Sequence, residues 1–298
     1  MAGTRYGTDR GLSARMAGTL FGIGLLYVIL AAALYALGVN AIFVLAISAA
    51  MLLGQWWFSD SMAMAAMRAV VVTPEQAPQL HAVIDRICAM ADMDKPRVGI
   101  ADSDVPNAFA TGRSPKRSAI VVTTGLLKRL DQEELEGVLA HELSHVAHRD
   151  VTVMTIASFT AILAGFMMRS VMWGRMGRDN NVAVVMLVVT LVSVLVYMVS
   201  YVLMRALSRY RELGADRGAA MLTGKPSALA RALQKISGEI AAIPTRDLRQ
   251  MEPVSSFAFA PAVRGGQGFS LGGLLSTHPT LEQRLEQLAR ISAQLGER

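Results

Sequence analysis

Hydrophobic residues gather in four long runs that polar stretches separate. Residues 16–39, 41–58, 151–168 and 182–204 contain no charged side chain. At 1.5 Å of helix per residue, each run is long enough to cross roughly 30 Å of hydrocarbon. The pattern therefore predicts four transmembrane helices arranged as two hairpins. A cleaved signal peptide is the alternative for the first run, because arginines precede it and Ala31–Ala33 resembles a cleavage site. The second run follows almost at once, which favours a membrane hairpin.

Polar sequence fills two remaining stretches of similar size. We expect an N-terminal hairpin in residues 1–59 and a second hairpin in residues 151–204, with residues 60–150 and 205–298 forming one domain that the second hairpin interrupts. Arginines flank the runs unevenly, and the positive-inside rule then places both termini and the domain in the cytoplasm. The cytoplasmic set is Arg5, Arg10, Arg15, Arg68, Arg149, Arg205, Arg209 and Arg211, against Arg169, Arg175 and Arg178 on the far side.

The polar stretch from residue 60 to 150 alternates between helix and strand patterns. A helix is expected to begin at Thr73-Pro74-Glu75-Gln76, which has an N-cap, a proline and a glutamine at the right spacing. Residues 97–101 and 118–123 are short β-branched runs that predict strands, and residues 106–112 predict a third strand at an edge. Asp131 and Glu134 predict a capping box that opens another helix. The fold class is therefore mainly α with a small β-sheet.

Composition and charge agree with a membrane protein. Hydrophobic residues make up 53% of the chain and charged residues 17%, below the roughly 25% of soluble domains. The net charge of +6 would suit nucleic acid or an anionic membrane. Because the arginines lie beside the apolar runs and no nucleic-acid motif is present, we expect the lipid bilayer as partner and no nucleic acid. The single cysteine, Cys88, does not indicate an oxidising compartment.

The helix that begins after Asp131 contains the pattern His-Glu-x-x-His. His141 and His145 lie one turn apart on one face, so both imidazoles can bind a single Zn²⁺ ion. Glu142 would face the attacking water and take its proton. His148 is about 10.5 Å of helix rise beyond His141, too far to join the same ion. The metzincin pattern also fails, because position 151 is valine rather than histidine.

The third ligand must therefore come from elsewhere in the chain. Glu212 and Asp216 lie one turn apart just after the fourth apolar run. One carboxylate could bind the ion while the other orients a ligand imidazole. A solvated, charged helix start is the alternative. The hairpin enters the membrane shortly after His145 and leaves it shortly before Glu212, which favours the metal site.

These motifs together resemble the HtpX family of membrane zinc metalloproteases, which is related to the CAAX prenyl endopeptidases. The resemblance rests on His141-Glu142-Leu143-Ser144-His145, on Glu212-x-x-x-Asp216 after two apolar spans, and on Ser276-Thr277-His278-Pro279. It implies a gluzincin-like site facing the cytoplasm, with one zinc ion, Glu212 as third ligand and Asp216 as its support. It also implies endoproteolysis of misfolded or damaged membrane proteins during stress, in a multi-pass inner-membrane protein.

The resemblance gives a meaning to two further segments. Asn107, Ala108, Phe109 and Ala110 would form an edge strand beside the metal, where an extended substrate pairs. His278 would donate to the developing oxyanion, and Arg284 would hold its loop. A helix-entry role is the alternative for His278, because Thr280 and Gln283 form a capping box directly after it. Residues 242–273 show no pattern that predicts a structure.

Two other classes of function compete with a protease. A zinc-stabilised membrane scaffold or adaptor without turnover is one, but a structural metal site has no use for Glu142. A transporter is the other, but the four runs lack ionisable residues in their interiors. The sequence does not predict the oligomeric state.

Overall fold

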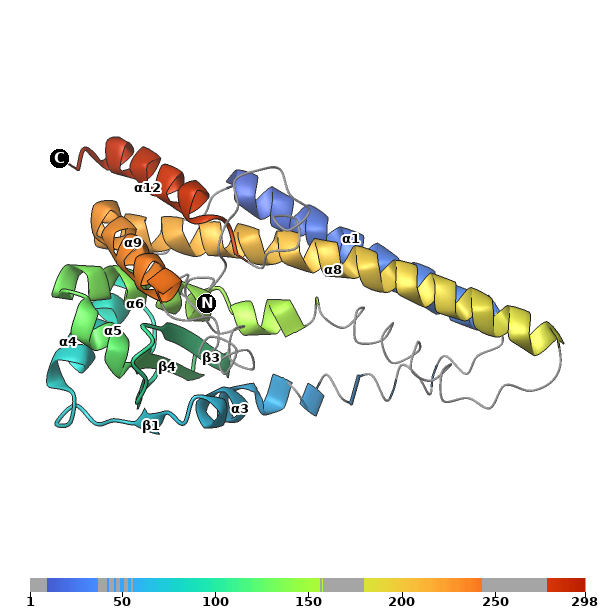
Figure 1. Cartoon of the computed structure of the whole chain (residues 1–298), viewed down its shortest axis with the longest axis horizontal. Helices are drawn as coiled ribbons and strands as arrows, with labels where there is room; N and C mark the ends of the chain where they lie inside the picture. The colour runs from blue at the N-terminus through green and yellow to red at the C-terminus, as the bar shows by residue number, and fades with distance from the viewer. Residues whose placement is uncertain are drawn as a thin grey trace.

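The fold is described here from a computed structural model. It describes residues 10–36, 56–155, 157, 180–242 and 278–297, together with scattered positions between 42 and 54. A head of short helices and a small sheet lies at one end of two long helices that extend away from it side by side (Figure 1). The head contains all the residues proposed above for the metal site.

A four-stranded mixed sheet forms the floor of the head. Its strands are β1 (Val70–Val71), β2 (Arg97–Ala101), β3 (Ala108–Ser114) and β4 (Arg117–Thr123). Their order is β1-β2-β4-β3, with β2 and β4 parallel and the other pairs antiparallel. The three predicted strands are therefore confirmed, and β3 lies at the edge as expected. The two-residue β1 was not predicted.

Close to its end, β3 has an irregularity in its pairing with β4, and this irregularity depends on a glycine. Gly112 has φ +130°, and a Cβ there would lie 2.2 Å from the carbonyl oxygen of Arg117. Any other residue would clash with the neighbouring strand. The glycine therefore allows β3 to stay paired with β4 along one edge up to the end of the strand.

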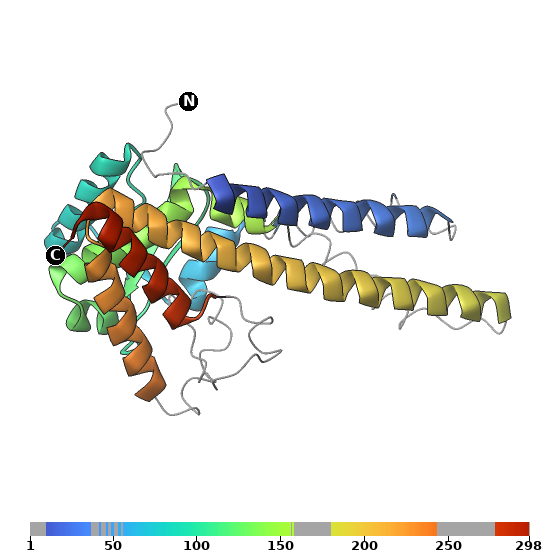
Figure 2. The ribbon, with the colours of Figure 1, turned by 90° about the horizontal axis from the view of Figure 1, so that it is seen from above.

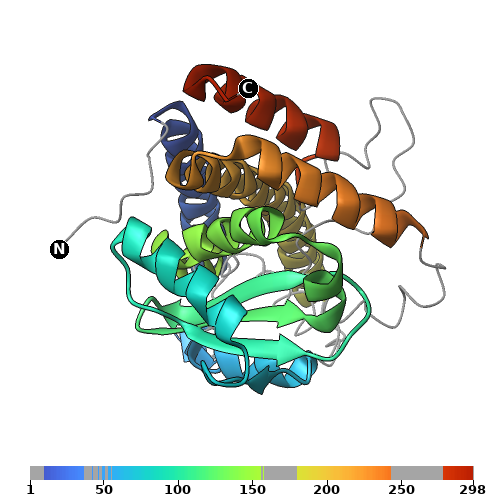
Figure 3. The same ribbon diagram turned by 90° about the vertical axis from the view of Figure 1, so that its left-hand side faces the viewer.

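Short helices cover the sheet and build the core of the head. They are α3 (Ser59–Ala66), α4 (Pro78–Ala91), α5 (Thr124–Arg129), α6 (Gln132–Ala147), α9 (Pro226–Ala242) and α12 (Leu281–Leu295). The capping boxes predicted at Asp131 and at Thr280 are both formed. Helix α6 lies between the sheet and α9, where its apolar side chains join the main hydrophobic core, whereas α3 packs on the opposite face of the sheet (Figure 3).

The helix expected to begin at Thr73 begins later, at Pro78. The side chain of Gln76 does accept a hydrogen bond from the Thr73 backbone N–H, at 2.9 Å. However, the backbone N–H groups of Gln76 and Ala77 both donate to the Thr73 carbonyl, which closes a turn instead of starting a helix. The expected start is therefore wrong by about one helical turn, because the local hydrogen bonds of a capping box also suit an isolated turn.

The two long helices are α1 (Arg10–Ala36) and α8 (Asn180–Thr223), which lie side by side (Figure 2). Their outer surfaces are apolar: Phe21 is 75% exposed and Leu195 65% exposed. The face of α8 that is buried carries small residues such as Ser193 and Ser200, which permit close packing of helices in lipid. Within the described residues, one helical stretch, Thr190–Thr223, is long and apolar enough to cross a membrane.

The prediction of four spans is not confirmed, because among the described residues one stretch, in α8, has the length and apolar composition of a span. Helix α1 covers most of the first run, and α8 covers the fourth. About half of the run at 41–58 and most of the run at 151–168 lie outside the described residues, as do Arg169, Arg175, Arg178 and residues 243–277. Helix α8 also continues unbroken past the expected end of its apolar run and delivers Glu212 and Asp216 directly into the head.

Candidate metal centre

Helix α6 fixes the first part of the centre by close packing on both sides. Gly137 lies against the backbone of Leu229 in α9, where an added Cβ would be 3.2 Å from its Cα atom. This contact brings α9 against one face of α6 and leaves its other side toward the sheet and α8. His141 and Glu142 are buried, and the two imidazoles of His141 and His145 meet edge to face, with ring centroids 4.8 Å apart.

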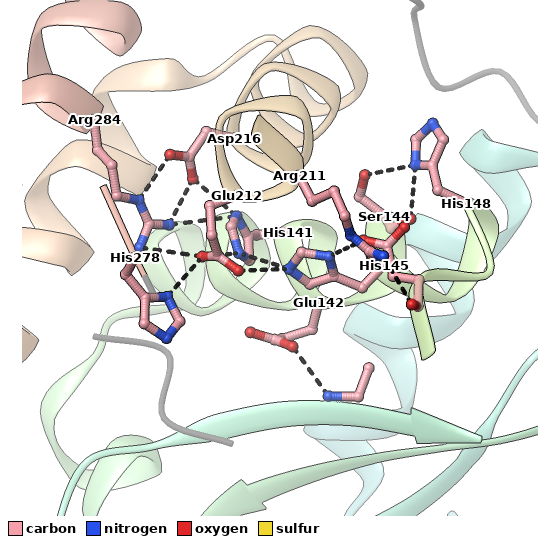
Figure 4. A network of polar contacts seen from close by, with 12 residues as sticks. His141, Glu142, Ser144, His145, His148, Arg211, Glu212, Asp216, His278 and Arg284 are labelled. Carbon is pink, nitrogen blue, oxygen red and sulfur yellow. Dashed lines mark hydrogen bonds and ion pairs between the residues drawn. The ribbon is translucent and has the colours of Figure 1, made fainter. Parts of the chain in front are cut away.

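Helix α8 brings Glu212 to both imidazoles. Its carboxylate oxygens lie 3.6 Å from Nε2 of His141 and 3.5 Å from Nε2 of His145, and the two Nε2 atoms are 3.2 Å apart. Figure 4 shows the three side chains converging from two helices. Among the described residues, His141, His145 and Glu212 form the group whose ligand atoms could hold one metal ion.

The spacing of these atoms fits a tetrahedral ion. Metal–nitrogen and metal–oxygen bonds of about 2.0–2.1 Å place neighbouring ligand atoms about 3.3–3.4 Å apart in a tetrahedron. The three measured separations bracket this value. Two imidazole nitrogens and one carboxylate also form the donor set that catalytic zinc prefers, with a fourth position left for water or substrate. The residues present therefore fit a single divalent ion.

The other nitrogen of His141 contacts a buried carboxylate. Its Nδ1 lies 2.8 Å from Asp216, which is 0% exposed. Asp216 accepts two hydrogen bonds from Arg284, from Nε at 2.7 Å and from Nη2 at 2.6 Å. Asp216 thus contacts an imidazole and a guanidinium, and these buried polar contacts connect α6 through α8 to α12. The structure brings both sequence candidates, Asp216 and Arg284, to the centre.

The other nitrogen of His145 contacts a second carboxylate that the sequence analysis missed. Nδ1 of His145 lies 2.5 Å from Asp150, and Asp150 is paired in turn with Arg211. Nη1 of Arg211 also donates to the backbone carbonyl of Asp150, at 2.8 Å. The chain can return to His145 because Arg149 adopts a left-handed φ of 56° just after α6 ends. The position of Asp150 five residues after His145 was the available sequence signal.

Carboxylates at both Nδ1 atoms assign the tautomers. Each Nδ1–H donates to its carboxylate, so each Nε2 turns a lone pair toward the other and toward Glu212. Lone pairs at this separation repel unless a cation or a proton lies between them.

Burial lowers the pKa of His141, but the Asp216 carboxylate outweighs this effect and raises the pKa to about 9. Burial lowers the pKa of His145 to about 4, against the attraction of Glu212. Without a metal, His141 therefore holds the proton.

Glu142 points away from the three ligands and toward the sheet (Figure 4). Its Oε2 accepts a hydrogen bond from the backbone N–H of Ala110 in β3, at 3.0 Å. Burial raises the pKa of this carboxyl, while the nearby imidazoles of His141 and His145 lower it. A carboxylate with a raised pKa, beside but outside the ligand set, is suited to accept and return a proton near neutral pH.

The four residues of the predicted edge strand have different surroundings. The Asn107 backbone N–H donates to Thr123, and Ala108 is buried in the core beneath α6. Phe109 packs with Ala63 and Val121 in a separate cluster, so its side chain lies on the far face of the sheet. Ala110 contacts the centre through its backbone N–H, which donates to Glu142. The strand thus borders the site with its main chain.

Two of the other three histidines, His278 and His148, have distinct positions relative to the centre. Nδ1 of His278 lies 3.3 Å from Oε2 of Glu212, so its ring is beside the ligand set. His148 caps the end of α6 and contacts Ser144 through its backbone carbonyl at 2.8 Å and its hydroxyl at 3.2 Å. His148 is therefore held away from the ligands, as its spacing predicted.

The sequence is similar to those of known proteins over nearly its whole length. The family model for "Peptidase family M48" matches residues 74–292. "Protease HtpX homolog 1" from Streptomyces coelicolor is 54% identical over 99% of this chain and 97% of its own length. "Protease HtpX homolog" from Moorella thermoacetica is 49% identical over 99% of both chains. The crystal structure of S. mikatae Ste24p aligns with a TM-score of 0.55 at 17% identity, over 89% of this chain and 62% of that chain, and so supports the fold.

Proposed function

Because this chain belongs to peptidase family M48 and is a membrane metalloprotease, we propose that its ion is zinc and that it cleaves misfolded or damaged membrane proteins. The observation that carries the zinc assignment is the convergence of the ligand atoms: the two Nε2 atoms are 3.2 Å apart, and the Glu212 carboxylate places Oε1 3.5 Å from His145 and Oε2 3.6 Å from His141. In this proposal His141, His145 and Glu212 bind one ion per chain.

The reaction is hydrolysis of a peptide bond. Bound zinc supplies Lewis acidity, which polarises the scissile carbonyl and acidifies a water molecule. Glu142 takes the proton from the attacking water and passes it to the leaving amine. His278, whose ring Glu212 holds beside the site, donates to the developing oxyanion. Asp216 and Arg284 keep the His141 ring in the orientation that binding requires.

The substrate binds by adding a strand to β3. The Ala110 N–H that contacts Glu142 points away from β4, so the outer edge of β3 faces the proposed proton acceptor. A small hollow with room for about one water molecule lies between this edge and the end of α6, lined among others by Ala110, Gly112 and His145. An extended peptide bound along β3 would therefore present its main chain to Glu142 and to the ion.

The head lies at the cytoplasmic face of a multi-pass inner-membrane protein in this proposal. Helix α8 runs from its exposed apolar residues into the centre without a break. Its apolar part ends at Met204, and Glu212 follows about 12 Å further along the helix. A site this near the lipid is suited to segments of membrane proteins that have left the bilayer.

Glu142→Gln separates metal binding from cleavage. Full-length protein in detergent is assayed for zinc content and for cleavage of an unfolded membrane protein, with and without a chelator. The wild type should cleave, stop with chelator and recover with zinc. Glu142→Gln should keep one zinc per chain and cleave about 10²–10⁴-fold more slowly, because it lacks the proton acceptor. His141→Ala should lose both zinc and cleavage.

Glu133→Gln is the matched control. Glu133 lies on the same helix but at the surface, where it pairs with Lys225, so its removal should leave cleavage within about twofold of the wild type. Cleavage by Glu142→Gln at the wild-type rate would contradict the role of Glu142 as proton acceptor. Full activity in the presence of chelator would show that cleavage does not require a metal ion.

A further inference from the structure

A cavity of about 320 Å³ lies where α1, α8 and α12 meet, and none of the proposed metal ligands lines it. Each helix contributes an arginine to it: Arg15 from α1, Arg217 from α8 and Arg290 from α12. Gln287 and Gln294, which are two turns apart on α12, add amide groups. The cavity is at the lower end of the size range of small-ligand sites.

The charge of this cavity is of one sign. Among the described residues that line it there is no aspartate or glutamate. Gln287 donates to the backbone carbonyl of Leu213 at 2.7 Å, which fixes α12 against α8 and thereby sets the spacing of the walls. Guanidinium groups on separate helices that face one space match the oxygens of a phosphate group, which each can bind through two parallel hydrogen bonds.

The depth of the cavity relative to the apolar surface favours a lipid as the source of that phosphate. Arg15 directly precedes the uncharged part of α1, and Gly22, about two turns later, lies against α8, where an added Cβ would be 3.4 Å from Cδ1 of Leu203. Gly11, which also lines the cavity, is about 6 Å further from the hydrocarbon. The headgroup layer on each side of a bilayer has about this thickness.

We propose that this cavity binds the phosphate group of an anionic phospholipid at the membrane surface. Basic pockets between helices on the cytoplasmic side are suited to such headgroups. Arg217 directly follows Asp216 on α8, and Arg290 shares α12 with Arg284, so an occupant would hold α12 in place beside the metal centre. The inference rests on the proposed membrane placement of α1 and α8 and is independent of the proposed chemistry.

The test uses full-length Glu142→Gln protein in a neutral detergent, so that cleavage has no part in the readout. Calorimetric titration compares soluble dihexanoyl phosphatidylglycerol, dihexanoyl phosphatidylcholine and inorganic phosphate. The phosphatidylglycerol should bind most tightly, and should raise the thermal midpoint, because it binds the folded form. In the Arg217→Gln/Arg290→Gln variant its affinity should fall by about tenfold or more.

The matched control removes two exposed arginines elsewhere on the head, Arg86→Gln/Arg231→Gln, and should change the affinity by less than about twofold. Equal binding by the two double variants would overturn the site. Inorganic phosphate that binds as tightly as phosphatidylglycerol would overturn the lipid assignment. If the Arg217→Gln/Arg290→Gln protein shows no cooperative melting, Arg290→Gln alone decides, with an expected loss of about threefold, and an unchanged affinity would overturn the site.

Discussion

The two histidines of the centre have the same kind of support, built in two different ways. Each imidazole contacts a carboxylate through Nδ1, and each carboxylate contacts an arginine. On the His141 side, Asp216 and Arg284 both lie within helices, α8 and α12, and are 0% and 1% exposed. On the His145 side, Asp150 follows the end of α6 at a left-handed turn and is 8% exposed.

The arginines make the difference sharper. Arg284 holds Asp216 through two side-chain hydrogen bonds. Arg211 contacts the side chain of Asp150 and also its backbone carbonyl. The His141 support therefore depends on side-chain charge in a fully buried place, whereas the His145 support depends partly on the path of the main chain. Substitutions that change charge should therefore lower stability and zinc affinity more at the His141 support than at the His145 support.

Asp216→Asn should have the largest effect. The change keeps the shape but removes the charge that balances Arg284, and an uncompensated buried charge costs about 3–5 kcal/mol. The His141 ring also loses its orienting partner, so zinc affinity should fall by about 100-fold. Competition with a chelating dye measures the affinity, and the thermal midpoint in detergent reports the stability. A variant that binds zinc as the wild type does would show that Asp216 does not position His141.

Asp150→Asn should have a smaller effect in the same assays. Arg211 keeps its hydrogen bond to the backbone carbonyl, and the site is slightly open to water, so we expect about a tenfold loss of zinc affinity. The decrease in thermal midpoint should also be smaller. A loss equal to or greater than that of Asp216→Asn would contradict the distinction between the two supports.

The sequence predicts the His141 support better than the His145 support for a physical reason. Glu212 and Asp216 lie one helical turn apart, and helical spacing places both carboxylates on one face whatever the rest of the fold does. The same rule located His141, His145 and both confirmed capping boxes. Arg284 was identified through the family resemblance, because no local rule connects α12 with α8.

Asp150 escaped prediction because its position depends on a single backbone angle. A left-handed conformation at a non-glycine residue is uncommon, and the residues His148-Arg149-Asp150 contain no pattern that predicts it. The unbroken path of α8 was also missed, since the change from apolar to charged residues near Arg205 reads as the end of one element. Helix propensity does not change there, and the tertiary contacts of the head keep the helix intact.

The pH dependence of the metal-free protein should separate the two histidines. The pKa of His141 is raised to about 9, so its contribution to stability is present below about 6.5 and is lost as pH rises through 9. The pKa of His145 is lowered to about 4, so its contribution is present above about 6.5 and is lost as pH falls through 4. Thermal midpoints in chelator should therefore fall on both sides of about pH 6.5. His141→Gln should flatten the alkaline side and His145→Gln the acid side, and the reverse assignment would contradict the asymmetry.

Arg149→Gly should have the smallest effect and the opposite sign. Arg149 is exposed and holds a φ of 56°, a conformation that costs a non-glycine residue about 1–2 kcal/mol. Glycine relieves that cost but makes the unfolded chain more flexible, so the net gain should be about 0.5–1 kcal/mol, with zinc affinity unchanged. Arg149→Ala removes the same side chain without relieving the backbone and should not gain stability. If the two variants melt together, the turn stores no strain. A gain confined to glycine would instead show that the turn before Asp150 is held in a strained backbone conformation.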